Sequence, residues 1–316
     1  MMLFLLVAIA AGVASALLAA GVAAGSMVAV PLFYLAPLPV MIAGIAFSPA
    51  VAFIAALIAA AGLGWAYGGS FLLAYVVGMG VPAFGLSYAA LLARAEPAGR
   101  DGLLWFPLGG LVLLAALFST IGVTVAVLTL ASDYDTYLST IINMMDALTA
   151  TRAHVPPEQD MVRMAELVAQ VLPPMAAVAS MVSLLACLYL AGRAALFSSR
   201  LSRPWPSLAS LRLPARTLPV VAVAAVLSLL PGMIGLVSSA ALATLLLAYA
   251  LAGFSVVHAI TMGMGLRSII LTGLWAATLM LGWPAIFMAG LGCLDAVLDL
   301  RSRYTRGRQP PAANDR

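Results

Sequence analysis

Few residues in this chain could do redox or metal chemistry, and their spacing does not assemble a site. The two histidines, His154 and His258, lie far apart, and the two cysteines, Cys187 and Cys293, stand alone in apolar stretches. The 16 methionines are scattered, so flexible apolar filling is a better interpretation than copper binding. We therefore expect no metal site and no cofactor, and two cysteines that behave as small buried apolar residues.

Carboxylates could do acid–base chemistry, but they are also rare within the apolar stretches. Asp295 and Asp299 lie one helical turn apart and are followed by Arg301 and Arg303. An ionisable group inside a membrane span is expensive and would mark function. The adjacent arginines favour an interfacial salt-bridge cluster, and a proton relay through Asp295 is the alternative. Phosphate-binding loops, HExxH and GxSxG motifs are missing, so we expect neither an enzyme nor a nucleic-acid-binding protein.

The elements that position these residues follow from composition. Hydrophobic residues make up 64% of the 316 positions and charged residues only 8%, against roughly 45–50% and 25% in soluble domains. The unbroken apolar runs lack the alternation of barrel strands, and an unpaired backbone group is costly in lipid. The sequence therefore predicts an all-α polytopic transmembrane bundle whose main partner is the lipid bilayer.

About eight to ten spans are expected, since a hydrocarbon core of about 30 Å needs roughly 20 apolar residues per helix. Whether 268–298 forms two short spans, turning near Gly282, or one helix kinked at Pro284 stays open. The expected spans are 3–20, 27–46, 50–64, 71–93, 103–131, 171–192, 217–230, 235–257, 268–282 and 284–298.

Charge predicts the orientation, because arginine accumulates in cytoplasmic loops. Five arginines lie in the connector 193–216 and more crowd the tail 300–316, whereas 133–170 is mainly acidic. The connector and both termini are therefore expected in the cytoplasm, and 133–170 outside.

The segment 133–170 is patterned as an amphipathic helical hairpin. Apolar residues from Tyr134 to Leu148 recur at helical spacing, opposite Asp135 and other polar residues, and Pro156 and Pro157 separate the two arms. The hairpin either lies flat in the headgroup layer or folds over the bundle. In the second case we expect a ligand pocket beneath it, with four candidate ligand-binding residues: Tyr67, Asp133, Asn143 and Asp146. The aromatic residues of the 65–70 loop fit a membrane-interface belt as the alternative.

Two features of the first spans bear on packing and binding. The first span carries a row of small residues, Gly12, Ala16, Ala20 and Ala24, which would allow close helix contact either within the chain or with a partner transmembrane subunit. The second span contains Pro31, Pro37 and Pro39, and broken spans often line transporter sites.

With these features, the chain resembles the YybS-like family of uncharacterised bacterial membrane proteins. The resemblance lies in the small-residue first span, the proline-broken second span, the stretch Arg203, Pro204, Trp205, and the ending from Gly292 to Arg301. The first six helices of that family are similar to the substrate-capturing S components of energy-coupling factor importers. The resemblance implies that 1–192, which includes the external hairpin 133–170, is a six-helix bundle that captures a small molecule. The chain departs from the S components after Gly192, where composition and charge predict a basic cytoplasmic connector at 193–216, further membrane helices at 217–299 and a disordered cytoplasmic tail at 300–316.

Two functions are compatible with these features. The first is a small-molecule transport component in the bacterial cytoplasmic (inner) membrane, working with a transmembrane coupling subunit and ATPases. The second is a non-transporting scaffold or assembly factor whose basic face contacts anionic lipid or a cytosolic partner.

Overall fold

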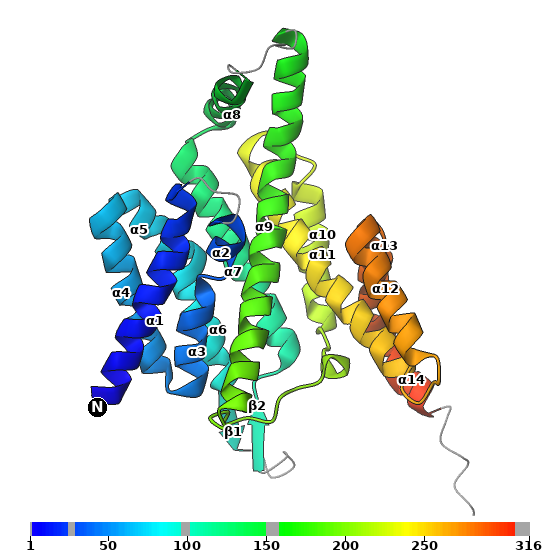
Figure 1. Cartoon of the computed structure of the whole chain (residues 1–316). Coiled ribbons are helices and arrows are strands. Elements are labelled where there is room, and N and C mark those ends of the chain that lie inside the picture. The colour runs from blue at the N-terminus through cyan, green and yellow to red at the C-terminus, as the bar shows by residue number, and fades with distance from the viewer. Residues whose placement is uncertain (1, 25–28, 96–101, 150–157, 307–316) are drawn as a thin grey trace, which may run out of the picture. The chain divides into compact units, whose positions relative to one another are not determined.

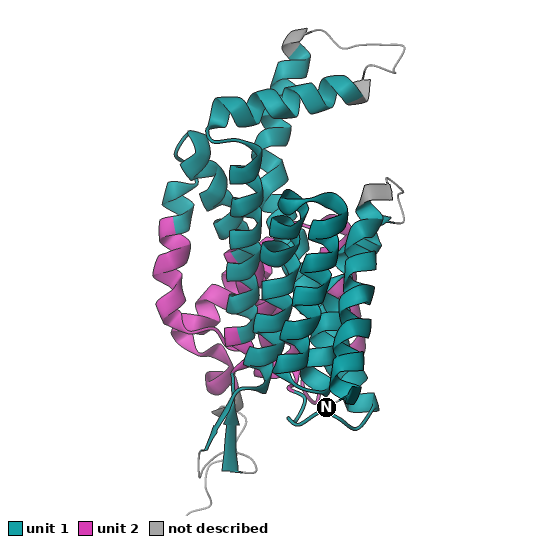
Figure 2. Ribbon diagram, turned by 90° about the vertical axis from the view of Figure 1, so that its left-hand side faces the viewer, with its two compact units in different colours: residues 1–106, 111–205, 224–244 teal, residues 107–110, 206–223, 245–316 magenta. Residues whose placement is uncertain are grey.

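The computed structural model describes residues 2–24, 29–95, 102–149 and 158–306 (Figure 1). These residues form two compact units, coloured in Figure 2. Unit 1 comprises 1–106, 111–205 and 224–244, and unit 2 comprises 107–110, 206–223 and 245–316. Each unit is described on its own.

Unit 1 is a bundle of long apolar helices that lie alongside one another (Figure 2). It contains α1 (Met2–Ala20), η1 (Gly21–Ala24), α2 (Ala29–Tyr34), α3 (Pro37–Ala46), α4 (Pro49–Tyr67), α5 (Gly69–Tyr75), η2 (Val76–Gly80), α6 (Val81–Leu91), β1 (Ala93–Ala95), β2 (Leu103–Trp105), most of α7 (Leu108–Leu130), α8 (Tyr134–Thr149), α9 (Glu158–Phe197) and parts of α10 (Leu218–Leu227) and α11 (Gly232–Ile260).

Unit 2 contains η4 (Leu208–Ser210), η5 (Ala215–Thr217), most of α10 (Leu218–Leu227), the second half of α11 (Gly232–Ile260), α12 (Arg267–Leu281), α13 (Pro284–Leu298) and α14 (Leu300–Arg306).

The all-α membrane bundle is confirmed. Within the described residues, seven helices are long and apolar enough to cross a membrane, and three shorter apolar helices accompany them. These ten correspond to the ten expected spans. Large apolar side chains such as Leu17, Phe53 and Leu117 are exposed, which is how a helix presents itself to lipid.

One pair of predicted span ends is wrong. Ala93, predicted to end the fourth span, and 103–105, predicted to start the fifth, instead belong to two short antiparallel strands, 93–95 and 103–105, in which Arg94 pairs with Leu104. Phe106 continues the pairing by donating its N–H to the Leu92 carbonyl. The reason is Pro107, because a residue that precedes proline is pushed out of the helical region. The fifth span therefore begins only at Leu108.

The second span is broken between α2 and α3, as its prolines predict. Pro37 cannot donate an N–H to the preceding turn. The Tyr34 carbonyl beside the break instead accepts hydrogen bonds from the Ser183 hydroxyl and, at 3.5 Å, from the Cys187 thiol, both on α9. The Ala36 carbonyl accepts one from the Ser15 hydroxyl at 2.6 Å. Neighbouring helices thus satisfy the backbone groups that the break exposes, as lipid requires.

The fourth span contains a π-helical turn, η2, which the sequence pattern does not predict. Pro82 lacks the N–H that a regular helix would give to the Gly78 carbonyl, and the Val81 N–H bonds to the Val76 carbonyl, one residue further back than in an α-helix. Pro82 is thus a local cause of the wider turn. Turns of this kind are often found at functional sites.

The amphipathic hairpin is confirmed for the described residues, and α8 lies crosswise at one end of unit 1 (Figures 1 and 2). Tyr137 and Ile141 are buried against Ala165 and Ala169 of α9. Residues 150–157, where the arms were predicted to turn, lie outside the described residues. The second arm and the sixth span are one continuous 40-residue helix, α9, not two. At about 1.5 Å per residue α9 spans about 60 Å, twice the hydrocarbon core.

A prolyl pair lies inside α9 without ending it. Pro173 cannot donate to the Ala169 carbonyl, and the Tyr137 hydroxyl, which comes from α8, donates to that carbonyl at 3.4 Å. Tyr137 is only 1% exposed. The first arm of the hairpin therefore compensates for the proline in the second.

Asp133 starts α8 by capping its first turn, which leads to a pH-dependent prediction. Its carboxylate accepts from the Thr136 N–H at 2.8 Å and the Thr136 hydroxyl at 2.9 Å. These bonds lower the pKa of Asp133 below its ordinary value of 3.8. A carboxylate with a lowered pKa stabilises the fold at neutral pH, and this contribution is lost as the pH falls below 3.8 through the folded-state pKa.

We therefore expect Asp133→Ala to speed amide hydrogen exchange across α8 at neutral pH, and the difference from the native protein to shrink at acid pH. Asp133→Asn is the matched control, because it keeps a cap acceptor that does not titrate. A difference that persists unchanged in acid would contradict the capping role.

In unit 2, the segment 268–298 is two helices. Gly282 ends α12 with a φ of 74°, a left-handed conformation that glycine adopts readily, and α13 starts at Pro284. The hairpin alternative left open by the sequence is therefore the observed one. α13 crosses α11 closely, because a Cβ added at Gly292 would lie 2.0 Å from the Tyr249 carbonyl oxygen.

Candidate ligand-binding cavity

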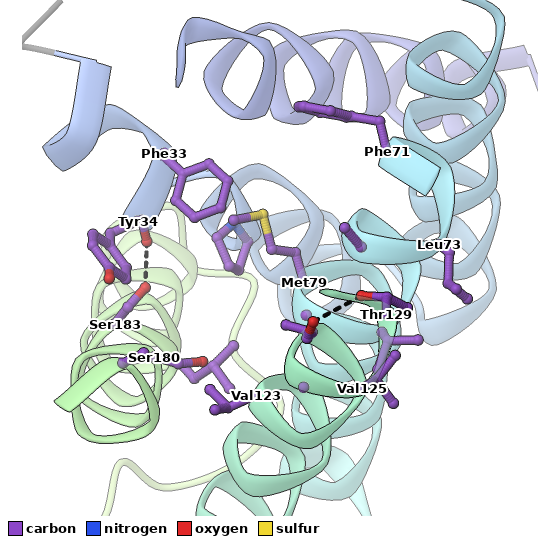
Figure 3. Close-up of a pocket in the computed structure, with 18 of the residues that line it drawn as sticks. Phe33, Tyr34, Phe71, Leu73, Met79, Val123, Val125, Thr129, Ser180 and Ser183 are labelled. Atoms are coloured by element: carbon purple, nitrogen blue, oxygen red, sulfur yellow. Dashed lines mark hydrogen bonds between the residues drawn. The ribbon is translucent and has the colours of Figure 1, made fainter. Parts of the chain in front are cut away.

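Unit 1 contains a partly open cavity of about 600 Å³ (Figure 3). This volume lies within the roughly 300–1,000 Å³ of small-molecule sites. The lining residues come from α2, α3, α5, η2, α7 and α9 and are mainly apolar. They are Phe33, Tyr34, Pro37, Ser70, Phe71, Leu73, Ala74, Val77, Gly78, Met79, Gly122, Val123, Val125, Ala126, Thr129, Leu130, Ala176, Ser180, Ser183 and Leu184.

The cavity lies toward the end of unit 1 that carries α8. Ser70, near the start of α5, and Leu130, the last residue of α7, both line it. α8 begins at Tyr134, soon after Leu130. The cavity thus occupies the end of the bundle that was predicted to face outside.

Both irregular points of the spans border this cavity. Tyr34 and Pro37 flank the break between α2 and α3, and Val77, Gly78 and Met79 belong to the π-helical turn. Non-helical backbone at membrane depth is tolerated where it is buried in protein or faces a cavity. The prolines of the second span were the sequence signal for this site, whereas Pro82 was overlooked.

The polar groups of the cavity are hydroxyls. Ser183 is occupied with the Tyr34 carbonyl and Thr129 with the Ala126 carbonyl at 2.8 Å. Within the described part of the chain, the hydroxyls of Ser70 and Ser180 have no hydrogen-bond partner. Ser180 is half-buried on α9 and lies beside Val123 in the lining (Figure 3). A bound molecule could therefore exchange a hydrogen bond with Ser180.

The four residues predicted to bind ligand do not line this cavity. Tyr67 ends α4, is 49% exposed and packs against Phe71, which does line the cavity, with ring centroids 5.0 Å apart. Asp133 caps α8, and Asn143 and Asp146 lie exposed on the side of α8 opposite its buried face. The structure does not bring the four together, and their binding role stays a prediction.

The small-residue row of α1 is used within the chain at Gly12. A Cβ there would lie 2.6 Å from the Ala55 carbonyl oxygen of α4, so Gly12 is not available to a partner subunit. Ala16 and Ala20 are half-buried and pack near Ala59 and Leu63. The side chain of Ala24 lies outside the described residues. Docking through Ala16 and Ala20 stays a prediction.

Of the salt-bridge cluster predicted for Asp295, Asp299, Arg301 and Arg303, the structure of unit 2 shows the pair of Asp295 with Arg301, and this pair is buried. The Arg301 guanidinium donates to Asp295 at 2.6 and 3.0 Å, to the Ser255 hydroxyl at 2.9 Å, and to the carbonyls of Ala209 and Leu211 at 3.0 and 2.8 Å. The second pair, Arg212 with Asp299 at 2.9 Å, is exposed. The buried ion pair ties the connector to α11, α13 and α14.

Arg203 is a buried residue whose contacts the sequence did not predict. It is 7% exposed, and its guanidinium donates to the Ala90 carbonyl at 2.7 Å and lies 5.8 Å from the Trp105 ring. Burial lowers its pKa. The neighbouring Trp205 fills the space above Gly192, where a Cβ would lie 1.7 Å from the indole. This part of the connector belongs to unit 1 and is packed inside that unit.

In the described ranges, no group of three or more His, Cys, Asp or Glu side chains could hold a metal ion. Cys187 is buried and Cys293 half-buried, and both are free thiols.

The chain matches the model of the family described as "Predicted membrane protein (DUF2232)" over residues 7–296. The chain belongs to this family. It is thus an integral membrane protein of an uncharacterised family, as its apolar helices indicate. No curated protein and no solved structure matches it significantly.

Proposed function

We propose that this protein is the substrate-capturing component of a small-molecule transport system. The observation that supports the proposal most directly is the cavity of about 600 Å³ at the broken second span. Transporter sites are commonly formed where spanning helices are interrupted, since the interruption frees backbone and creates space at membrane depth. Here two interruptions, at Tyr34 and Pro37 and at Val77–Met79, border one cavity.

The orientation of the cavity fits capture from outside. It lies toward the end that carries α8, next to the acidic segment 133–170, while the arginine-rich connector and tail are proposed to remain in the cytoplasm of a bacterial cell. A cysteine introduced at the exposed Ser139 of α8 is expected to react with an impermeant maleimide added to intact cells. Reaction only after the cells are opened would reverse the proposed orientation.

The scaffold alternative has less support, because most arginines of the connector already have contacts. Arg203 is buried, Arg212 is paired with Asp299, and Arg200 lies 4.5 Å from the Phe47 ring. Arg200 and Arg212 are exposed, but each already has a partner within the chain, so binding of a cytosolic partner would have to replace these contacts. Our proposal includes that the protein is not an enzyme.

Two glycine substitutions allow a matched test of the cavity. A Cβ at Gly78, in the cavity wall, or at Gly62, on the exposed side of α4, would meet no atom within 4 Å. Gly78→Leu therefore places a side chain at the cavity without a backbone clash, and Gly62→Leu makes the same chemical change facing lipid.

The native protein and both variants are purified from their own membranes, and copurified proteins and small molecules are identified by mass spectrometry. We expect a transmembrane coupling subunit and an ATPase pair with all three proteins, and a bound small molecule with the native protein and Gly62→Leu but not with Gly78→Leu. Purification of the native protein with neither ATPases nor a small molecule would reject the transport role. Enrichment of cytosolic proteins alone would favour the scaffold.

A further inference from the structure

The chemistry of the cavity wall restricts what can bind there. None of its lining residues has a charged side chain. Apart from glycines, they carry alkyl, aromatic, thioether and hydroxyl groups. From this wall we infer that the ligand is an uncharged, largely apolar molecule carrying a single hydrogen-bonding group that contacts Ser180. The inference rests on the proposed function, and it names the substrate class of that site.

Electrostatics supports the exclusion of charge. An ion that leaves water for a low-dielectric site loses its hydration, and only an opposite charge or several hydrogen bonds can replace it. The cavity offers no opposite charge. Ser183 and Thr129 already donate to carbonyls within the chain, and the remaining hydroxyls, those of Tyr34, Ser70 and Ser180, come from three different helices and do not form a cluster around one group. A carboxylate or ammonium on the ligand would therefore weaken binding strongly.

The apolar body of the ligand has several matching contacts. Phe33 and Phe71 offer ring surfaces, Met79 a flexible thioether, and Leu73 and Val125 branched alkyl groups (Figure 3). Aromatic surfaces and methionine adapt well to apolar ligands of varied shape. The free hydroxyl of Ser180 can then orient the ligand through its one polar group, because within the described residues it has no partner in the chain.

A series of naphthalene derivatives separates charge from shape. The four probes are 2-ethylnaphthalene, 2-naphthaleneethanol, the carboxylate of 2-naphthaleneacetic acid, and 2-(2-naphthyl)ethylammonium. They share the ring and differ mainly in the terminal group. Binding to the native protein in lipid nanodiscs is measured by equilibrium dialysis at neutral pH. The binding measured with Gly78→Leu is subtracted, because that variant retains partitioning into lipid, and Gly62→Leu is the control that keeps the cavity.

We expect the alcohol to bind about 100-fold more tightly than either charged probe, in line with the cost of placing a charge in the membrane interior. The alcohol should also bind about fivefold more tightly than the hydrocarbon, as one hydrogen bond allows. Ser180→Ala should remove this fivefold preference and leave the discrimination against charge unchanged.

The outcomes distinguish this inference from the proposed function. If the acid or the amine binds as tightly as the alcohol, the substrate class is wrong while a binding cavity remains. If the alcohol shows no specific binding, the inference is overturned, since lipid chains in large excess then occupy the cavity equally well. The transport role itself is judged by the copurified ATPases and bound small molecule.

Discussion

Arg301→Gln is expected to lower the free energy of unfolding by about 3–5 kcal/mol, as removal of one partner of a buried ion pair does. The side chains of Arg301 and Asp295 are only 5% and 7% exposed. Without the guanidinium, the Asp295 carboxylate stays buried without its cation, and the carbonyls of Ala209 and Leu211 lose their donor. The loss is measured by titrating the purified protein in detergent with denaturant and comparing the free energy of unfolding of the native protein and the variant.

Two further variants test the cause. Arg212→Gln removes the same type of side chain from the exposed pair with Asp299, and solvent-exposed pairs contribute little, so little change is expected. Combining Arg301→Met with Asp295→Leu removes both buried charges and should recover most of the stability. Equal losses in Arg301→Gln and Arg212→Gln would show that the buried ion pair has no special weight.

Gly292→Ala is expected to destabilise the protein by about 1–3 kcal/mol, the usual range for overpacking. The added Cβ would lie 2.0 Å from the Tyr249 carbonyl oxygen and 3.0 Å from the Gly253 nitrogen, both on α11. Backbone atoms cannot rotate aside, so α13 must move away from α11. The shift would also disturb Tyr249, whose hydroxyl lies 2.5 Å from that of Thr217.

The matched control lies on the same helix. Gly290→Ala makes the same change where a Cβ would meet no atom within 4 Å. Because alanine is better than glycine in a helix interior by roughly 0.5–1 kcal/mol, this variant should be as stable as the native protein or slightly more stable. Thermal unfolding of the two variants in one detergent compares them directly, and a Gly290→Ala variant as unstable as Gly292→Ala would refute the close crossing.

The placement of the spans could be predicted closely because it depends on local composition. Each run of about 20 apolar residues must form a helix in lipid whatever its neighbours are. The same local reasoning found the break before Pro37 and the buried face of α8 with Tyr137 and Ile141. It failed at Leu103–Trp105, where an apolar run pairs as a strand because Pro107 delays the helix.

The cavity could be predicted only in part. The prolines of the second span indicated where backbone would be interrupted, but Ser180 and Gly122 carry no local signal of facing the same space. Tyr67 and Asp133 are predicted to bind ligand because they are polar or aromatic residues near one end of the bundle. Their positions, beside Phe71 and at the α8 cap, depend on how helices distant in sequence pack.

By itself the sequence determined that the chain lies in lipid, that its spans are helices, and where prolines interrupt them, because hydrophobicity and a missing N–H act within one segment. Only the tertiary structure decided which residues share the cavity, that Arg203 and Arg301 are buried, and that Gly12 and Gly292 contact other helices of the chain. These outcomes depend on which helix faces meet, and in a chain that is apolar on most sides the sequence pattern distinguishes those faces poorly.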